Sequence, residues 1–270
     1  MYICAAGDIH GALSRLYDDV MAFEASLGIR FDWVLHVGDF GIWPDPTRID
    51  RGTRNHDGAG EFQAWLAEKR AAPRRTVFIK GNHEDFEWLE RQHSREVLPN
   101  LTHLPNGHTV DLEDRLSGSI RVGGVGGCYG PSDYERPSRQ LRGYEKRHYT
   151  RDEIERLKTV GSIDIVLTHD APAGVQFPTH RRGSNYISNA TGLDTLLDKV
   201  RPRVAFFGHH HTRIDADVAG IRCIGLNIVK RPGNLVALEI SRYEREWLLL
   251  GEWPRRENHV ACAQGLASQG

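Results

Sequence analysis

Short apolar runs of strand length alternate along this chain with stretches of helical period, and this alternation constrains the fold more than any other feature. It is typical of α/β proteins, in which helices cover a sheet. The apolar runs predict strands at Tyr2–Ala6, Trp33–Val37, Thr76–Ile79, Ile120–Val125, Ile163–Leu167, Val204–Phe207, Ile221–Leu226, Leu235–Ile240 and Trp247–Leu250. The helical stretches predict helices at Ser14–Leu27, Glu61–Arg70, Phe86–Gln92, Thr150–Thr159 and Leu193–Val200. Because no helix separates the last three strands, we expect an antiparallel end to a mixed sheet.

The chain of 270 residues shows no internal repeat and no segment with the composition of a linker, which predicts one domain over residues 1–253. Residues 254–270 contain few apolar side chains and no period, so we expect a disordered tail. Two stretches, Phe40–Gly60 and Gly126–Tyr149, are longer than the connections of a compact domain. Loops of this length are usually functional or disordered.

Composition excludes two broad classes of protein. The 35 Lys and Arg residues against 36 Asp and Glu residues give a formal net charge of -1, so no global field attracts nucleic acid. The apolar runs fall far short of the roughly 18 to 20 residues that span a bilayer, and no secretory signal precedes the first strand. We therefore expect a cytoplasmic protein that does not bind membranes, in which any polyanion site is a local patch.

A cluster of polar residues follows five of the predicted strands. The clusters lie at residues 7–11, 38–39, 81–84, 169–170 and 208–211. Because parallel strands end at one edge of a sheet, we expect these clusters to converge. Asp8 and His10, like His209 and His211, are two residues apart, so an extended backbone would point both members of a pair the same way.

Histidines outside these clusters are expected to have structural or solvated positions. His36 lies inside a predicted strand, which favours a packed position in the core or behind the site. His56 and His103 are expected to be solvated.

The clusters combine carboxylate, imidazole and amide groups without a thiolate. This donor set suits Mn²⁺, Fe or Zn²⁺ in open catalytic coordination better than a closed structural zinc site. Seven such groups are too many for one tetrahedral ion. Two ions roughly 3.5 to 4 Å apart would need a bridging carboxylate, and together they would activate a hydroxide for in-line attack on phosphorus. Asp39, in the middle of the series, is the predicted bridge.

Taken in order, the clusters read D-x-H, G-D, G-N-H-E, H and G-H-x-H, and this series resembles the calcineurin-like metallophosphoesterases. The resemblance implies a four-layer αββα sandwich of two mixed sheets flanked by helices. It implies one metal site from Asp8, His10, Asp39 and His211, and another from Asp39, Asn82, His169 and His209. It also places His83 beside the scissile phosphate, where this residue would protonate the leaving oxygen or stabilise its charge, and leaves His210 outside the ligand set.

A closer resemblance covers roughly residues 1–253 and is to the RNA lariat debranching enzymes, which cleave 2′,5′-phosphodiester bonds. The matching text is Gly38-Asp39-Phe40, residues 81–84, residues 120–127 with Asp133-Tyr134 behind them, and residues 163–165 leading to residues 168–172. The sequence has Asp8 where the eukaryotic pattern has Cys, and it lacks much of the eukaryotic C-terminal extension. The aspartate favours an ordinary two-metal site.

The segment 133–151 holds six basic and three acidic residues, a local charge of +3, with tyrosines interleaved. This mixture suits phosphate contacts combined with base stacking, and the corresponding region of the debranching enzymes resembles a substrate-recognition loop. The predicted substrate contacts are Arg136, Arg139, Arg142, Tyr134 and, in the loop after Asp39, Trp43. Arg181 and Arg182 could add a second phosphate contact. The alternatives are a solvated charged surface for the segment and a packing role for Trp43.

These patterns predict a dimetal phosphodiesterase, with Mn²⁺ favoured, that hydrolyses an RNA or nucleotide phosphodiester by attack of a metal-bridging hydroxide. A phosphomonoesterase acting on a phosphoprotein or small nucleotide is the first alternative. Against it, the G-D-x-x-D-R-G block of protein Ser/Thr phosphatases is not intact after Asp39. The second alternative is a non-catalytic binding protein of the same fold, which would be expected to lose a ligand or His83, and neither is missing.

Overall fold

The computed structural model describes residues 1–114, 118–178, 185–241 and 247–254. Within these ranges the chain forms two large mixed sheets, a small hairpin and five α-helices. None of these helices is long and apolar enough to cross a lipid bilayer.

The first sheet has a parallel centre and antiparallel edges. Its strands are β1 (Tyr2–Ala6), β2 (Trp33–His36), β3 (Arg75–Phe78), β4 (Glu96–Leu98), β5 (Leu101–His103), β14 (Leu235–Ile240) and β15 (Trp247–Trp253). They lie in the order β15-β14-β1-β2-β3-β5-β4. The strands β1, β2, β3 and β5 are parallel, whereas β14 runs antiparallel to both its neighbours and β4 runs antiparallel to β5.

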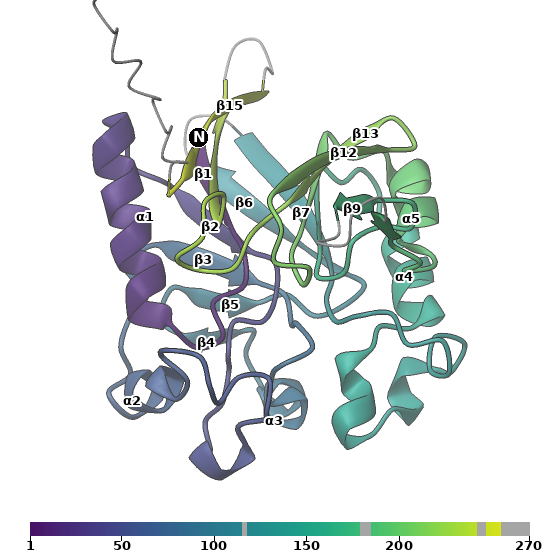
Figure 1. The fold of residues 1–270 in the computed structure, drawn as a ribbon, viewed down its shortest axis with the longest axis horizontal. Helices are drawn as coiled ribbons and strands as arrows, with labels where there is room; N and C mark the ends of the chain where they lie inside the picture. The colour runs from purple at the N-terminus through teal and green to yellow at the C-terminus, as the bar shows by residue number, and fades with distance from the viewer. Residues whose placement is uncertain (115–117, 179–184, 242–246, 255–270) are drawn as a thin grey trace, which may run out of the picture.

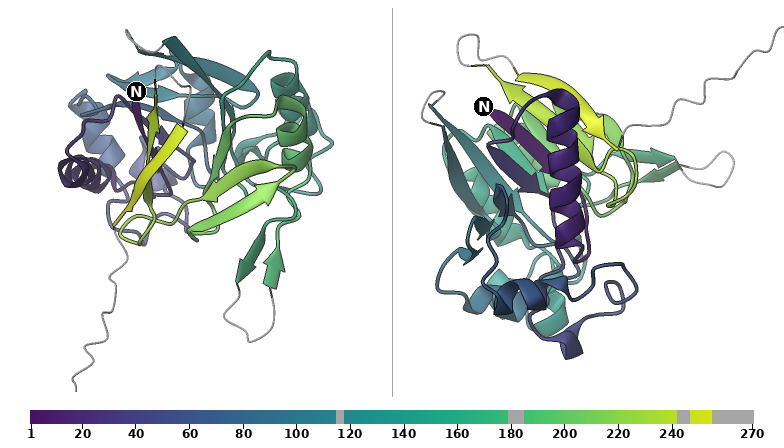
Figure 2. Two further views of the ribbon diagram at one scale, coloured as in Figure 1. Left: turned by 90° about the horizontal axis from the view of Figure 1, so that it is seen from above. Right: turned by 90° about the vertical axis from the view of Figure 1, so that its left-hand side faces the viewer.

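The second sheet repeats this plan. Its strands are β6 (His108–Asp114), β7 (Gly118–Val125), β8 (Ile165–Thr168), β11 (Val204–Phe207), β12 (Ile214–Val218) and β13 (Ile221–Gly225). They lie in the order β12-β13-β11-β8-β7-β6, with a parallel centre and with β6 and β12 antiparallel at the edges. The strands β9 (Gln176–Pro178) and β10 (Asn185–Ile187) form a separate hairpin that projects from the body of the molecule (Figure 2).

Helices cover the outer faces of both sheets (Figure 1). The helices α1 (Leu13–Leu27), α2 (Glu61–Ala67) and α3 (Phe86–Arg91) belong to the side of the first sheet, and α4 (Arg151–Lys158) and α5 (Leu193–Val200) cover the second. Short 3₁₀ turns η1 (Pro46–Arg48), η2 (Ser138–Gln140) and η3 (Gly143–Arg147) interrupt the two long loops.

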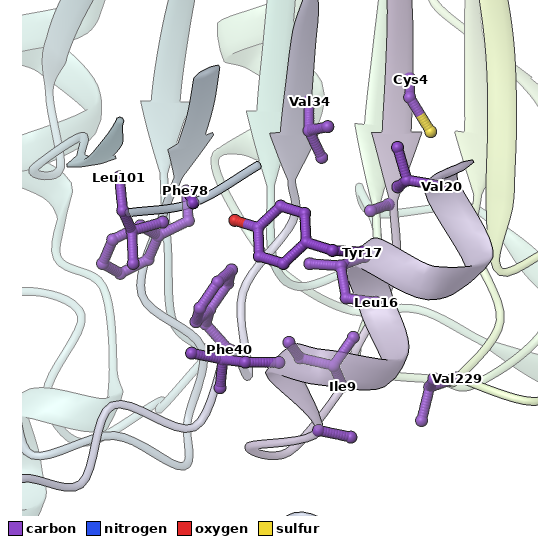
Figure 3. Close-up of a cluster of buried hydrophobic side chains, with 14 of the residues drawn as sticks. Cys4, Ile9, Leu16, Tyr17, Val20, Val34, Phe40, Phe78, Leu101 and Val229 are labelled. Atoms are coloured by element: carbon purple, nitrogen blue, oxygen red, sulfur yellow. The ribbon is translucent and has the colours of Figure 1, made fainter. Parts of the chain in front are cut away.

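Alternation of side chains along each strand builds three apolar layers. Ile3 and Ala5 of β1 point inward and pack with Leu167 and Phe206 of the second sheet. Cys4 points outward, into the layer beneath α1 (Figure 3). In that layer the buried Tyr17 hydroxyl is hydrogen-bonded to the Thr76 hydroxyl at 2.9 Å, which satisfies both polar groups. The predicted four-layer αββα sandwich is therefore confirmed.

The nine predicted strands and five predicted helices are present, with ends that differ from the prediction by at most three residues. The last three strands were predicted to form an antiparallel end of one sheet, and this is correct for two of them and wrong for the third. The strands β14 and β15 do pair antiparallel, but β13 belongs to the second sheet, where it lies parallel to β11. The apolar pattern shows that a strand is buried and not which sheet receives it. The edge strands β4, β6 and β12, the neighbouring strand β5 and the β9–β10 hairpin were not predicted, because they are short or rich in polar residues.

Candidate metal centre

All five predicted clusters follow strands, but they come from both sheets. The first three leave β1, β2 and β3 of the first sheet, and the other two leave β8 and β11 of the second. The expected convergence is present, although it joins the carboxyl ends of two packed sheets instead of one sheet edge. All seven predicted ligands lie in one connected cluster, as the following distances show.

A first group of donors consists of Asp8, His10 and His211, whose ligand atoms all lie within 4.8 Å of one another. The Nε2 atoms of His10 and His211 are 3.3 Å apart, and His211 Nε2 is 3.0 Å from Asp8 Oδ2. Ligand bonds of about 2.1 Å separate two nitrogens on one ion by roughly 3 to 3.5 Å. The spacing of this group fits a single ion.

A second group surrounds His169, which is fully buried. Its Nε2 lies 2.9 Å from Asn82 Oδ1, and the rings of His169 and His209 have centroids 5.1 Å apart. His169 Nδ1 donates to the backbone carbonyl of Val37 at 2.8 Å, which fixes the ring and leaves Nε2 for a ligand role. The neighbouring His210 contacts Asp170 at 3.0 Å and stacks on Phe177.

Asp39 lies between the two groups. Its Oδ2 is 3.7 Å from His10 Nε2 and 3.5 Å from His169 Nε2. Its Oδ1 accepts a hydrogen bond from the backbone N–H of His83 at 2.8 Å, which orients the carboxylate. A single oxygen close to a nitrogen of each group is the arrangement that a bridging carboxylate requires.

The backbone of the centre is held in an unusual conformation. His10, Asp39, His209 and His211 have positive φ angles of 46°, 52°, 64° and 48°. Non-glycine residues seldom adopt this region, and such strain gathers at functional sites. The ligand pairs therefore converge through left-handed turns, and the extended backbone that we expected for them is wrong.

Glycines next to the ligands provide space as well as tight turns. A Cβ atom on Gly81 would lie 2.0 Å from Asp39 Oδ1, and one on Gly208 would lie 2.2 Å from Asp8 Oδ1. Each glycine of the G-N-H-E and G-H-x-H blocks thus makes room for a carboxylate from another cluster. These contacts link strands that are far apart in sequence.

The electrostatics of the centre favour a bound cation. Burial lowers the pKa of His10 and of His209 to about 4, so both imidazoles are neutral, as metal ligands must be. Burial also opposes a charge on His169, but Asp39 and Asp8 raise the pKa of His169 to about 10. Two buried carboxylates thus attract positive charge into the centre. Donor types, spacing and charge together fit divalent cations at the two groups.

His83 stands beside the centre in a pair that was not predicted. Its Nδ1 is 2.6 Å from Asp50 Oδ2, and Asp50 lies in the long loop after β2. Because a carboxylate only accepts, Nδ1 carries the proton. Burial opposes protonation of the ring, but the hydrogen bond to Asp50 and the charge of Asp39 raise the pKa of His83 above its usual value. A Cβ atom on Gly52 would lie 2.0 Å from the His83 ring, so the ring packs directly on this backbone.

Glu84, the last residue of the G-N-H-E block, joins two of the loops. Its carboxylate accepts hydrogen bonds from the backbone N–H groups of Phe40, Gly41 and Ile42 at 2.7, 3.0 and 2.6 Å. The loop that carries Asp39 is thereby fixed to the loop that carries His83. The sequence showed Glu84 as part of the block, but nothing in it indicated that the backbone of residues 40–42 would be its hydrogen-bond partner.

The surroundings of three other histidines were predicted, and one of these predictions is confirmed whereas two are wrong. His36 is fully buried behind the centre, where its Nδ1 accepts from the Gly38 N–H, as predicted. The prediction that His56 is solvated is wrong, because its ring stacks on His10 with centroids 4.1 Å apart and planes 10° apart. His103 is also not solvated, since it packs on Phe78 and burial lowers its pKa to about 3. Neither position could be inferred without the path of the loops.

The predicted substrate residues have different surroundings. Tyr134 is buried against Tyr129 and Tyr149 in the layer beneath α4 and α5, not at the metal centre. Arg136 is held by Asp133 and Glu145 of its own segment.

Arg139 and Arg142 are exposed, and within the described residues neither has a carboxylate partner within 4 Å. Trp43 is 5% exposed, and its Nε1 donates to Thr53 Oγ1. Arg181 and Arg182 lie outside the described residues.

Several known proteins are similar to this chain in sequence. Proteins named lariat debranching enzyme are 27% identical in Drosophila pseudoobscura pseudoobscura, over 80% of this chain and 43% of that protein, and 26% identical in Arabidopsis thaliana, over 81% and 56%. The Entamoeba histolytica protein of the same name is 23% identical over 95% of this chain and 79% of its own length. The chain thus spans about half the length of the first two relatives.

Solved structures share the fold. A protein from Thermus thermophilus superposes with a TM-score of 0.57 at 16% identity, covering 93% of this chain and 98% of its own. The calcineurin-like phosphoesterase YfkN from Bacillus subtilis gives 0.50 at 14% identity, covering 93% and 88%. The calcineurin-like phosphoesterase family matches residues 1–213. The chain therefore belongs to the calcineurin-like phosphoesterases, a family of metal-dependent phosphoester hydrolases with a dinuclear divalent metal centre.

Proposed function

We propose that this chain is a dimetal-dependent phosphodiesterase that hydrolyses an RNA or nucleotide phosphodiester. The observation that carries the proposal is the position of Asp39 Oδ2, between a donor group from β1 and β11 and a second group around His169. His83 lies next to this carboxylate. The pKa of His83 is raised above its usual value, which favours the protonated form that a general acid needs. In this proposal the ligands, the bridging carboxylate and the acid of a two-metal hydrolase all follow the carboxyl ends of strands.

Each residue has an assigned role in this proposal. Asp39 would be a ligand of both ions. The remaining ligands would be Asp8, His10 and His211 at the first ion, and Asn82, His169 and His209 at the second. Mn²⁺ is the favoured metal, because carboxylate, amide and imidazole donors without thiolate suit it.

The residues of the chain also position the substrate and its proton. Two divalent cations bound here would neutralise phosphate charge and activate a water for attack on phosphorus. Nδ1–H of His83 donates a hydrogen bond to Asp50, which fixes the ring orientation, and the raised pKa of His83 favours the imidazolium, which carries a second proton at Nε2. The proton passes to the ester oxygen as the bond from phosphorus to the leaving alcohol breaks. Asp50 also favours the charged imidazolium before transfer.

A diester of RNA is the favoured substrate class for two reasons. The relatives found by sequence are named lariat debranching enzymes, although the chain spans only part of most of them. Arg139 and Arg142 are exposed on the segment that was predicted to contact phosphates. Tyr134 is left out of this role because it is buried.

One activity panel tests the proposal. The purified protein is assayed with Mn²⁺ on a chromogenic phosphomonoester, a chromogenic phosphodiester, and 2′,5′- and 3′,5′-linked oligonucleotides, with a chelator-treated control. We expect metal-dependent cleavage of diesters in preference to the monoester. Preference for the monoester would establish the phosphomonoesterase instead, and a protein that binds no metal and cleaves nothing would be a non-catalytic relative.

A further inference from the structure

A cavity of about 190 Å³ opens next to the His83–Asp50 pair. Three segments form its walls: the loop after β2, the start of α3 and the turn η3. Its lining residues are Trp43, Arg48, Asp50, Glu84, Asp85, Phe86, Glu87, Gly143 and Tyr144. The cavity is smaller than the roughly 300 to 1,000 Å³ of pockets for drug-sized ligands. It has the size for one planar ring system.

Aromatic side chains line this cavity. Trp43 and Phe86 are 5% and 7% exposed, and the hydrogen bond from Trp43 Nε1 to Thr53 Oγ1 at 3.3 Å fixes the indole. Tyr144 is 56% exposed and has the guanidinium of Arg147 over its ring, 4.0 Å from the centroid. Arg147 covers one face of the tyrosine, so a ligand ring would stack on the opposite face.

The wall that carries Tyr144 is anchored to the rest of the site. The partly buried Lys80, which precedes the G-N-H-E block, donates from Nζ to the backbone carbonyls of Lys146 and His148 at 2.6 and 3.3 Å. Lys146 in turn forms an ion pair with Glu90 of α3, and α3 contacts η3. The stacking surface is therefore held in place before a ligand binds, which lowers the entropic cost of binding.

The negative charge of the cavity disfavours binding of a phosphate group other than the scissile one. Asp50, Glu84, Asp85 and Glu87 contribute four carboxyl groups to the lining, against one guanidinium from Arg48. Arg48 is already paired with Asp85 at 3.0 Å and Glu87 at 3.1 Å. An anionic group would meet an excess of negative charge, whereas an uncharged aromatic ring would meet aromatic walls and hydrogen-bond acceptors.

The position of the cavity next to His83 places it on the leaving-group side of the scissile bond. The leaving alcohol takes its proton from His83 Nε2, and a ribose separates the ester oxygen of a nucleotide from its base. A base site should therefore lie one sugar away from Nε2. Asp50, which accepts a hydrogen bond from His83 Nδ1 at 2.6 Å, lines the cavity, so only one carboxylate separates the cavity from the His83 ring, a distance that a bound nucleoside can reach across.

We propose that this cavity binds the nucleobase of the leaving nucleoside and stacks it on Tyr144. The inference rests on the proposed phosphodiesterase function and names the part of the substrate that the enzyme recognises. The substrate would be a diester whose leaving alcohol is a nucleoside, and the site would discriminate against a leaving group that carries no ring.

The test compares a dinucleoside phosphate with two analogues, one lacking the base on the leaving ribose and one lacking the base on the retained ribose. Product analysis of the parent substrate identifies which alcohol leaves. We expect removal of the leaving base to lower kcat/KM roughly 5- to 150-fold, the range of base–aromatic stacking, and removal of the retained base to change it less. Tyr144→Ala should abolish this preference, and Tyr144→Phe should retain it.

Tyr186→Ala is the matched control, because Tyr186 is also half-exposed, at 45%, but lies on the β9–β10 hairpin. The ratio of kcat/KM with and without the leaving base should be unchanged in this variant. Equal cleavage of the parent and both analogues by the wild-type protein would overturn the base site and leave the phosphodiesterase proposal standing. Failure of the Mn²⁺-loaded wild type to cleave any diester would overturn both.

Discussion

The metal centre and the segment 133–151 were both recognised from sequence, one by its motifs and the other by its charge. In the structure, the motif residues converge on one site, whereas most of the charged residues of the segment pair with other residues of the protein. The motif residues come from five loops on two sheets and meet in a buried cluster. The charges of the segment mostly find partners on the protein itself: Arg136 with Glu145, Arg151 with Glu135, and Lys146 with Glu90. Residues at strand ends are placed by the fold, whereas a local sum of charge does not reveal which charges face solvent.

The largest effect is expected from the residue that joins the two halves of the metal centre. Asp39→Asn removes a negative charge between the donor groups, so it should abolish turnover and lower the metal content of both sites. Metal analysis by mass spectrometry and circular dichroism would follow occupancy and folding. Full occupancy of both sites in a folded variant would be incompatible with a bridging role.

His83 should separate catalysis from metal binding. His83→Ala should retain its metal and lose turnover by about 10² to 10⁴ fold, the range for a positioned acid. The loss should be smaller for substrates with an acidic leaving group such as nitrophenol, which departs without a proton. Loss of metal from the variant would identify His83 as a ligand and remove it from the acid role.

Asp50 should set the pH range of activity. The acid form of His83 is active, so activity should fall as the pH rises through the pKa of His83. Asp50 helps to raise this pKa, and Asp50→Asn should therefore move the fall to lower pH, with a smaller loss of turnover than His83→Ala. The check is kcat against pH for both proteins at saturating Mn²⁺. An unchanged alkaline limb would show that Asp50 does not act on His83.

The smallest effect is expected in the charged segment, where two arginines differ from the rest. Replacing Arg139 and Arg142 by Gln should weaken RNA binding a few fold and reduce the salt slope by up to about 0.7 per lost phosphate contact. The matched control is Arg136→Gln, which breaks an ion pair and should leave the slope unchanged. The affinity and its salt slope are measured by titrating each protein with RNA at several salt concentrations. Equal slopes in all three proteins would make the segment a solvated surface.

Much of this molecule could be predicted because its strands are strongly apolar and its ligands follow them directly. The strands β1, β11 and β14 have the predicted bounds, and all seven predicted ligands lie in one cluster. Asp50 could not be found in this way, since it lies in a loop of many polar residues and its partner is 33 positions away. The stacking of His56 on His10 likewise depends on how that loop folds back.

We infer that the two sheets together hold a dinuclear metal centre bridged by Asp39. The most direct measurement is the number of divalent ions bound per wild-type chain, obtained by titrating metal-free protein with Mn²⁺ in a calorimeter and by elemental analysis of the product. We expect two ions per chain, with activity appearing as the second site fills. Saturation at one ion with full activity, or no binding at all, would contradict it.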